Sequence, residues 1–246
     1  MERLRLRESA YFTETLRDAL LKGPGFVLKE IAMKNGKSTA LPLAAAMFLA
    51  AAGVTASAAP SYHALSGSDA GTYRIDPQHT NVLFTIGHVG IVSFTGRFDQ
   101  VSGRYHLDPA TAAKDWAHIT IPVSSIDTNF GQRNRYLLGK EFFDAKKYPD
   151  IRFVSTRYVP HGSHAGELYG NLTLHGVTRP VVFRVRETGA GEVSYLPAPW
   201  GGYLSGFVAT VSIHRSDYGL TAYLPEGLSN RVRIRVEVEG IRVGGA

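Results

Sequence analysis

The sequence predicts an all-β fold, an eight-stranded antiparallel barrel with one short helix capping an end. From Tyr73 onward, apolar residues recur at every second position in short runs, which is the period of a half-buried strand. In the last run, from Arg231 to Val243, aliphatic side chains alternate with charged ones, so one face points to an interior and the other to water. Closing such a sheet into a barrel removes the two unpaired edges that an open sheet would leave.

Eight strands are predicted, and the apolar face of each follows from the alternation of its residues. The first strand carries Val82, Phe84 and Ile86 on one face, and the second is interrupted near Gly96, which indicates a bend. The inward positions mix small and large residues, and an eight-stranded barrel encloses room for side chains or for one slender ligand. The predicted ranges are Thr80–His88, Ile91–His106, Trp116–Ser124, Ile151–Pro160, Glu167–His175, Val181–Glu187, Gly202–Arg215 and Arg231–Val243.

A segment near residues 133–146 has a helical pattern, with Tyr136, Leu137 and Phe143 on one face. Pro149 cannot continue a helix and disfavours helical geometry in the residue before it, so the helix is expected to end by that point. In a chain of short strands, one aromatic-bearing helix either plugs one end of a closed sheet or lines a cavity inside it.

Residues 33–58 have the three parts of a secretory signal. Lys34 and Lys37 form the positive region, residues 40–54 form an apolar core, and Ala56-Ser57-Ala58 is a small-x-small cleavage site. The apolar run is shorter than the roughly 20 residues of a transmembrane helix. We therefore expect a signal peptide and export to the periplasm.

The remaining residues form three further segments. Residues 1–32 are an upstream extension, which a start codon assigned too early would explain, with a regulatory or targeting helix as the alternative. Residues 59–72 are rich in Ser, Ala and Gly, which predicts a short mobile linker. Residues 73–246 are the predicted barrel domain.

The charge and cysteine counts exclude several classes of function. The chain has 27 Lys and Arg and 21 Asp and Glu, of which residues 1–58 hold eight and five, leaving 19 basic and 16 acidic residues. No basic run in this remainder is typical of a nucleic-acid surface, so nucleic acid is not an expected partner. The absence of cysteine excludes disulfides and thiolate metal sites. A domain of about 175 residues can bury a core without them.

Short motifs spread over the chain from Tyr73 to Val243 carry a family resemblance. In order, they are Ile75-Asp76-Pro77-Gln78-His79-Thr80, Gly96-Arg97-Phe98, Ser125-Ile126-Asp127-Thr128, the block from Arg133 to Asp144, Lys147-Tyr148-Pro149, Phe153 with Ser155-Thr156, Leu172 to Thr178, and Arg215-Ser216-Asp217-Tyr218-Gly219. With these motifs the chain resembles the YceI-like family, exported bacterial proteins with a lipocalin-like barrel that bind polyisoprenoid-type lipids. One block departs from the family's R-D-x-H-L pattern, because it reads Arg133-Asn134-Arg135-Tyr136-Leu137.

The resemblance implies a tunnel for an apolar chain inside the barrel. Each inward residue either lines such a tunnel or simply fills a core, as inward apolar residues usually do. For the whole set, the resemblance favours the tunnel. The expected lining residues are Val82, Phe84, Ile86, Phe94, Phe98, Ile121, Val123, Tyr136, Leu137, Phe142, Phe143, Phe153, Leu172, Phe207, Val211 and Val236.

Polar residues near the helix and after the seventh strand are candidate contacts for a ligand head group, namely Arg133, Asn134, Arg215 and Asp217. The charged ones alternatively form a network that positions the helix, which is the interpretation we favour. The histidines are scattered without metal-ligand spacing, and no nucleophile elbow or phosphate-binding loop occurs, so we expect no metal and no catalytic residue.

The sequence therefore predicts a non-enzymatic periplasmic protein that binds and carries or sequesters a polyisoprenoid or a similar, quinone-like amphiphile. No other cofactor is expected. A small hydrolase or isomerase acting on an apolar substrate in the same cavity is one alternative, and a structural or stress-response barrel with a filled core is another. The expected partners are an apolar lipid and, transiently, a membrane or membrane protein, for a chain that is a monomer or homodimer.

Overall fold

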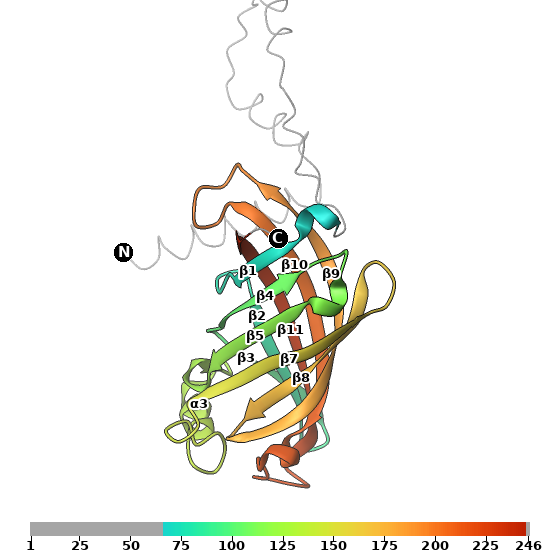
Figure 1. Cartoon of the computed structure of the whole chain (residues 1–246). Helices are drawn as coiled ribbons and strands as arrows, with labels where there is room; N and C mark the ends of the chain where they lie inside the picture. Colours follow the sequence, from blue (N-terminus) through green and yellow to red (C-terminus); the bar gives the residue numbers. More distant parts are fainter. Residues whose placement is uncertain (1–65, 245–246) are drawn as a thin grey trace, which may run out of the picture. The chain divides into compact units, whose positions relative to one another are not determined.

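Residues 66–244 are described in the computed structural model, and most of them lie in strands of one antiparallel sheet (Figure 1). The predicted upstream extension, signal segment and first part of the linker lie outside these residues. The strands are β1 (Gly71–Ile75), β2 (Asn81–His88), β3 (Val92–Phe98), β4 (Ser102–Leu107), β5 (Trp116–Pro122), β6 (Ile126–Asp127), β7 (Asp150–Pro160), β8 (Ala165–Leu174), β9 (Val177–Val193), β10 (Gly202–His214) and β11 (Leu228–Gly244).

The sheet closes into a ring because β1 pairs with β4 on one side and with β11 on the other. The ring order is β1-β4-β5-β7-β8-β9-β10-β11, and every pair in it is antiparallel. Three of the eight walls of the barrel each consist of two strands that follow one another, namely β1 with β2, β3 with β4, and β5 with β6. The predicted eight-stranded antiparallel barrel is confirmed.

The strands differ from the predicted ranges mainly where a wall is broken into two pieces. The bend in the second wall lies between β3 and β4, whereas the sequence predicts it near Gly96, which is inside β3. Between β1 and β2 the Asp76 carboxylate accepts a hydrogen bond from Gln78 N at 2.9 Å, a local turn that interrupts the ladder. The third wall is interrupted by a 3₁₀ turn, η4 (Val123–Ser125). β9 is longer than predicted at both ends.

One end of the barrel, beside β1, is filled by aromatic side chains. Tyr73 and Tyr105 stack with ring centroids 5.2 Å apart, and Phe207 meets the Tyr105 ring edge-on at 4.9 Å. The Tyr105 hydroxyl hydrogen-bonds the Ser205 hydroxyl at 2.7 Å and donates to the Ser205 carbonyl at 3.2 Å. β1 begins at Gly71, so the last residues of the predicted linker belong to the barrel wall.

The opposite end carries the helix and the long connection between β10 and β11 (Figure 1). The helix, α3, covers only Gly131–Leu137, which is shorter than predicted. After it, the Phe143 and Ala145 amides donate back to the Leu137 and Leu138 carbonyls at 3.0 and 3.1 Å, a looped geometry that a continuing α-helix does not have. No helix in residues 66–244 is both long and apolar enough to cross a membrane.

Candidate functional site

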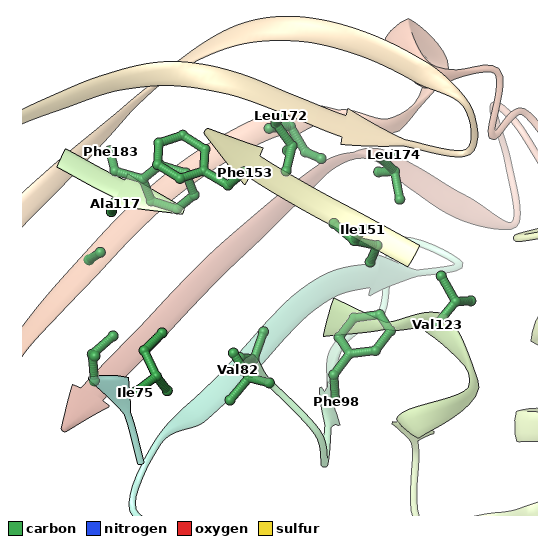
Figure 2. Packing of buried hydrophobic residues seen from close by; sticks show 14 of the residues in the cluster. Ile75, Val82, Phe98, Ala117, Val123, Ile151, Phe153, Leu172, Leu174 and Phe183 are labelled. Atoms are coloured by element: carbon green, nitrogen blue, oxygen red, sulfur yellow. The ribbon is translucent and has the colours of Figure 1, made fainter. Parts of the chain in front are cut away.

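The interior of the barrel contains an apolar cavity of about 600 Å³. Figure 2 shows Ile75, Val82 and Phe98 pointing from one side of the barrel toward Phe153 and Leu172 on the other. All five of these side chains border the cavity, and the wall between them consists almost entirely of aliphatic and aromatic groups. A volume of this size is typical of a ligand site.

An inward-facing glycine lets an aromatic ring lie against the cavity wall. Gly96 is paired with Phe84 across β2 and β3, so both face the interior. A Cβ atom at Gly96 would overlap the Phe84 ring. Gly170 receives the Phe153 ring in the same way, but a Cβ there would also lie 2.7 Å from the Val154 carbonyl oxygen. The absence of a side chain at Gly96 therefore keeps the Phe84 ring out of the cavity space.

Replacing Gly96 by Ala is expected to push the Phe84 ring into the cavity and to weaken the binding of an apolar chain about tenfold, the equivalent of roughly two displaced methylene groups. Titration with a fluorescent prenyl-chain probe measures the affinity. The double variant Gly96→Ala with Phe84→Leu is the control, because a smaller side chain at 84 should restore binding. Equal affinities of wild type and Gly96→Ala would contradict this role.

The structure places most of the predicted lining residues around the cavity. They come from β2, β3, β5, β7, β8, β10, β11 and the α3 region, and their alternation along each strand turns them to the same side. The predicted residues that border the cavity are Val82, Phe84, Ile86, Phe94, Phe98, Ile121, Tyr136, Leu137, Phe142, Phe143, Phe153, Leu172, Phe207 and Val236.

Two predicted lining residues, Val123 and Val211, do not border the cavity. Val123 lies in the turn η4, where the alternation of the strand is interrupted, and its side chain is fully buried in the core (Figure 2). Val211 lies in β10 beyond the last residue that pairs with β9, and it packs against the core while lining a groove at that position instead of the cavity.

The cavity opens at the end of the barrel that carries α3, and the sequence prediction missed much of this mouth. His88, Val89 and Val92 come from the β2–β3 hairpin, and Tyr223 and Leu228 come from the connection into β11. Val89, Val92 and Tyr223 are exposed as well as cavity-lining, with 48%, 59% and 56% of their surface accessible. An apolar residue on each side of Gly90 in a tight hairpin is the sequence signal that could have drawn attention to this position.

Tyr136 and Tyr223 meet across the mouth, with their hydroxyl oxygens 2.9 Å apart. The Tyr136 hydroxyl also donates to the Glu141 carboxylate. These two hydrogen bonds, with that to Glu141 the stronger cause, raise the pKa of Tyr136 above its ordinary value. The contact connects the α3 region with the β10–β11 connection on the rim of the cavity.

Arg215 lies at the inner side of the mouth and is only 4% exposed. Its guanidinium donates to the main-chain carbonyls of Leu220 at 2.6 Å, Ser229 at 2.9 Å and Leu228 at 3.1 Å. Burial lowers the pKa of Arg215 from its ordinary value. The residue therefore fixes the β10–β11 connection and at the same time places a positive charge on the cavity wall.

Arg133 is the second cation on the cavity wall. Its Nε donates to the Thr128 hydroxyl at 2.9 Å, and its guanidinium carbon lies 4.2 Å from the centre of the Phe94 ring. The two contacts hold the first turn of α3 against Phe94 of β3 and against Thr128, which lies between β6 and α3.

The other two candidate head-group residues lie away from the cavity wall. The Asn134 amide accepts a hydrogen bond from Thr128 N at 2.9 Å and donates to the Asp127 carboxylate at 3.2 Å, so it anchors α3 to β6. Asp217 lies in η5 (Arg215–Tyr218), where its carbonyl accepts a hydrogen bond from Arg179 at 3.1 Å on the outside of the barrel. Both therefore have positions that suit a structural role.

One group in residues 66–244 brings a histidine and two carboxylates together, Asp76, His79 and Glu239, with their ligand atoms within 4.8 Å of one another. His79 Nδ1 lies 2.8 Å from Asp76 and 3.3 Å from Glu239. The hydrogen bond to Asp76, followed by the charge of Glu239, raises the pKa of His79, while partial burial opposes the shift. The imidazole therefore ties the turn between β1 and β2 to β11.

Comparisons with known proteins identify the family. The model of the YceI-like domain matches residues 73–240. The chain belongs to the YceI-like family. Curated relatives of this YceI-like chain include a "UPF0312 protein" of Pseudomonas fluorescens, 37% identical over 70% of the chain and 88% of the relative. A "UPF0312 protein" of Vibrio cholerae is 33% identical over 71% of the chain and 89% of the relative. The predicted resemblance is confirmed.

Solved structures share the fold of this YceI-like chain. BcnA of Burkholderia cenocepacia matches with a TM-score of 0.60 and 26% identity, over 67% of this chain and 98% of BcnA. The YceI protein of Campylobacter jejuni matches with a TM-score of 0.54 and 27% identity, over 65% and 90% of the two chains. A domain from Saccharophagus degradans, described as polyisoprenoid-binding, matches with a TM-score of 0.52 and 19% identity, over 70% and 98%.

Proposed function

We propose that this YceI-like chain binds a polyisoprenoid or similar amphiphile, with the apolar chain inside the barrel, and carries or sequesters it in the periplasm. The observation that carries the proposal is the cavity of about 600 Å³, which is walled by apolar side chains and opens beside α3. A related fold is described as polyisoprenoid-binding in Saccharophagus degradans. The periplasmic location rests on the signal pattern of residues 33–58.

Burial of the chain supplies the binding energy in this proposal. Each buried methylene group contributes about 0.8 kcal/mol, so about ten of them offset an association cost of several kcal/mol. Affinity therefore depends on chain length more than on any single contact. Shape and length, rather than a precise set of hydrogen bonds, select the ligand.

The two cations on the cavity wall support a polar or anionic head group at the mouth. Arg215 is buried and donates to main-chain carbonyls, and it has no carboxylate partner within salt-bridge distance among residues 66–244. A buried positive charge is stabilised by an anion in the same low-dielectric surroundings. A head group with a phosphate, carboxylate or carbonyl oxygen near Arg215 and Arg133 would provide one.

Mass spectrometry of organic extracts from the purified native protein tests the proposal. We expect a prenyl lipid or a similar long-chain amphiphile in an amount close to one molecule per chain. Extracts without any amphiphile, together with turnover of ester or isomerisable test substrates, would instead support the hydrolase or isomerase. If the cavity takes up no added prenyl chain, the proposed function is wrong.

A further inference from the structure

The barrel wall is split between β9 and β10 on the half of the barrel that carries the mouth. Their pairing ends at Arg184 and Thr210, although β9 starts at Val177 and β10 continues to His214. A groove of about 970 Å³ lies on this split. Ile213, which faces the cavity, also lines the groove, so a single layer of side chains separates the two spaces there.

Arginines dominate this groove. Five of them line it, against the single carboxylate of Asp217: Arg179, Arg184, Arg231, Arg233 and Arg235. All five are exposed. Arg235 is paired with Glu237 at 2.6 Å, whereas the other four make no salt bridge with a carboxylate of residues 66–244. We call these five residues the arginine groove.

Exposed apolar residues lie next to the arginine groove. Ile91 at the tip of the β2–β3 hairpin is 86% exposed, and Val89, Val92 and Tyr223 are about half exposed at the same mouth. The hairpin lies beside the start of β11, because Val89 N donates to the Gly227 carbonyl at 2.8 Å and His88 is paired with Leu228. Arg231 lies three residues beyond Leu228 in β11. We call these four apolar residues the apolar rim.

We propose that the arginine groove and the apolar rim together dock this chain onto an anionic phospholipid bilayer. The arginines contact lipid phosphates, the rim enters the boundary between head groups and acyl chains, and the cavity mouth then faces the lipid. The delivery of a ligand through this contact rests on the proposed function, whereas the docking itself does not.

Charge and apolarity both fit this partner. A guanidinium binds phosphate oxygens through two parallel hydrogen bonds, and each basic residue near an anionic leaflet strengthens partition about fivefold. Aliphatic and tyrosine side chains at an exposed tip match the interfacial layer of a bilayer. A soluble acidic protein would satisfy the arginines but would leave the aliphatic tips in water, so the combination favours a membrane.

Vesicle co-sedimentation tests the proposal with the protein as purified from its producing cells. Vesicles of phosphatidylglycerol and phosphatidylethanolamine should bind it, and vesicles of phosphatidylcholine alone should bind it far less. The double variant Arg231→Glu with Arg233→Glu should weaken partition to the anionic vesicles by at least about 30-fold, because the loss of two attractive charges alone accounts for that factor and the two carboxylates add repulsion. Salt should weaken the binding of wild type as well.

The matched control is Arg74→Glu with Arg104→Glu, two exposed arginines that face each other across β1 and β4 outside the arginine groove. This pair makes the same change in net charge, so its effect should stay within about threefold of wild type at physiological salt. Ile91→Ser should reduce partition roughly tenfold, and Val154→Ser, an exposed valine on β7, should leave it unchanged. Circular dichroism confirms that each variant is folded.

The outcomes separate docking from ligand binding. Equal partition of the groove variant and its control would overturn the docking surface, and so would release of the protein from vesicles by millimolar inorganic phosphate, which would indicate a site for free phosphate. The affinity for a soluble short-chain prenyl probe is measured in parallel. If vesicle binding depends on the arginine groove but the protein does not bind the prenyl probe, docking is supported and the proposed function is wrong.

Discussion

Replacing Ala209 by Trp is expected to lower the affinity for an apolar chain about a hundredfold without unfolding the barrel. Ala209 lies in β10, faces the cavity and is 7% exposed. An indole ring at this position takes the space of about four methylene groups, and losing their burial costs about 3 kcal/mol of binding free energy. Because the ring fills space in the cavity instead of displacing packed atoms, the free energy of unfolding should stay the same or rise.

A control variant separates loss of cavity volume from added bulk. Val154→Trp places the same ring on β7, where Val154 is 45% exposed and does not border the cavity. Titration with prenyl probes of increasing length should show that Ala209→Trp shortens the longest chain bound, whereas Val154→Trp does not. If Ala209→Trp kept the affinity and the length preference of wild type, the interior cavity would not be the binding site.

Replacing Arg215 by Leu is expected to destabilise the fold by about 3 kcal/mol, because three main-chain carbonyl oxygens, one of them buried and two partly buried, lose their donor. For a domain of this size that corresponds to a fall in Tm of about 10 °C. Chemical and thermal unfolding measure the change. Arg215→Lys should lie in between, since one ammonium group cannot reproduce the fork that holds Leu220, Leu228 and Ser229.

The exposed Arg104 provides the control for the loss of an arginine. Arg104→Leu should change the free energy of unfolding by less than about 0.5 kcal/mol, because the side chain lies on the outer face of β4. A similarly small effect of Arg215→Leu would mean that other contacts hold the β10–β11 connection. Arg215 would then act as a ligand contact and not as a structural residue. A loss of ligand affinity in a fully stable Arg215→Lys variant would point the same way.

The sequence predicts the walls of the barrel well, because one physical rule governs them. Apolar residues that alternate with polar ones, as from Val232 to Val238, define both the strand and its inward face. The rule gives the correct strand number, and most of the predicted lining residues border the cavity. It does not apply at Val123, where a 3₁₀ turn breaks the period. Val211 keeps the alternation and packs against the core, but it lines a groove where β9 diverges instead of the cavity.

The mouth could be predicted only in part, because it is formed by connections whose positions depend on distant residues. Tyr223 meets Tyr136 across 87 positions of sequence, and Arg215 is placed by carbonyls of a loop that has no periodic pattern. The helix is shorter than its pattern because residues after Leu137 turn back on α3. The split between β9 and β10 leaves no trace in the alternation of either strand.

The closure of the ring sets the order in which this chain becomes a barrel. The other walls of the ring pair with neighbours close in sequence, but the pairing of β1 with β11 joins Thr72 to Gly244, near the two ends of the domain. During synthesis the last strand leaves the ribosome last, so earlier strands form at most an open, curved sheet. The closed barrel therefore exists only after β11 has been made, and a truncation before Leu228, which removes β11, would leave it open.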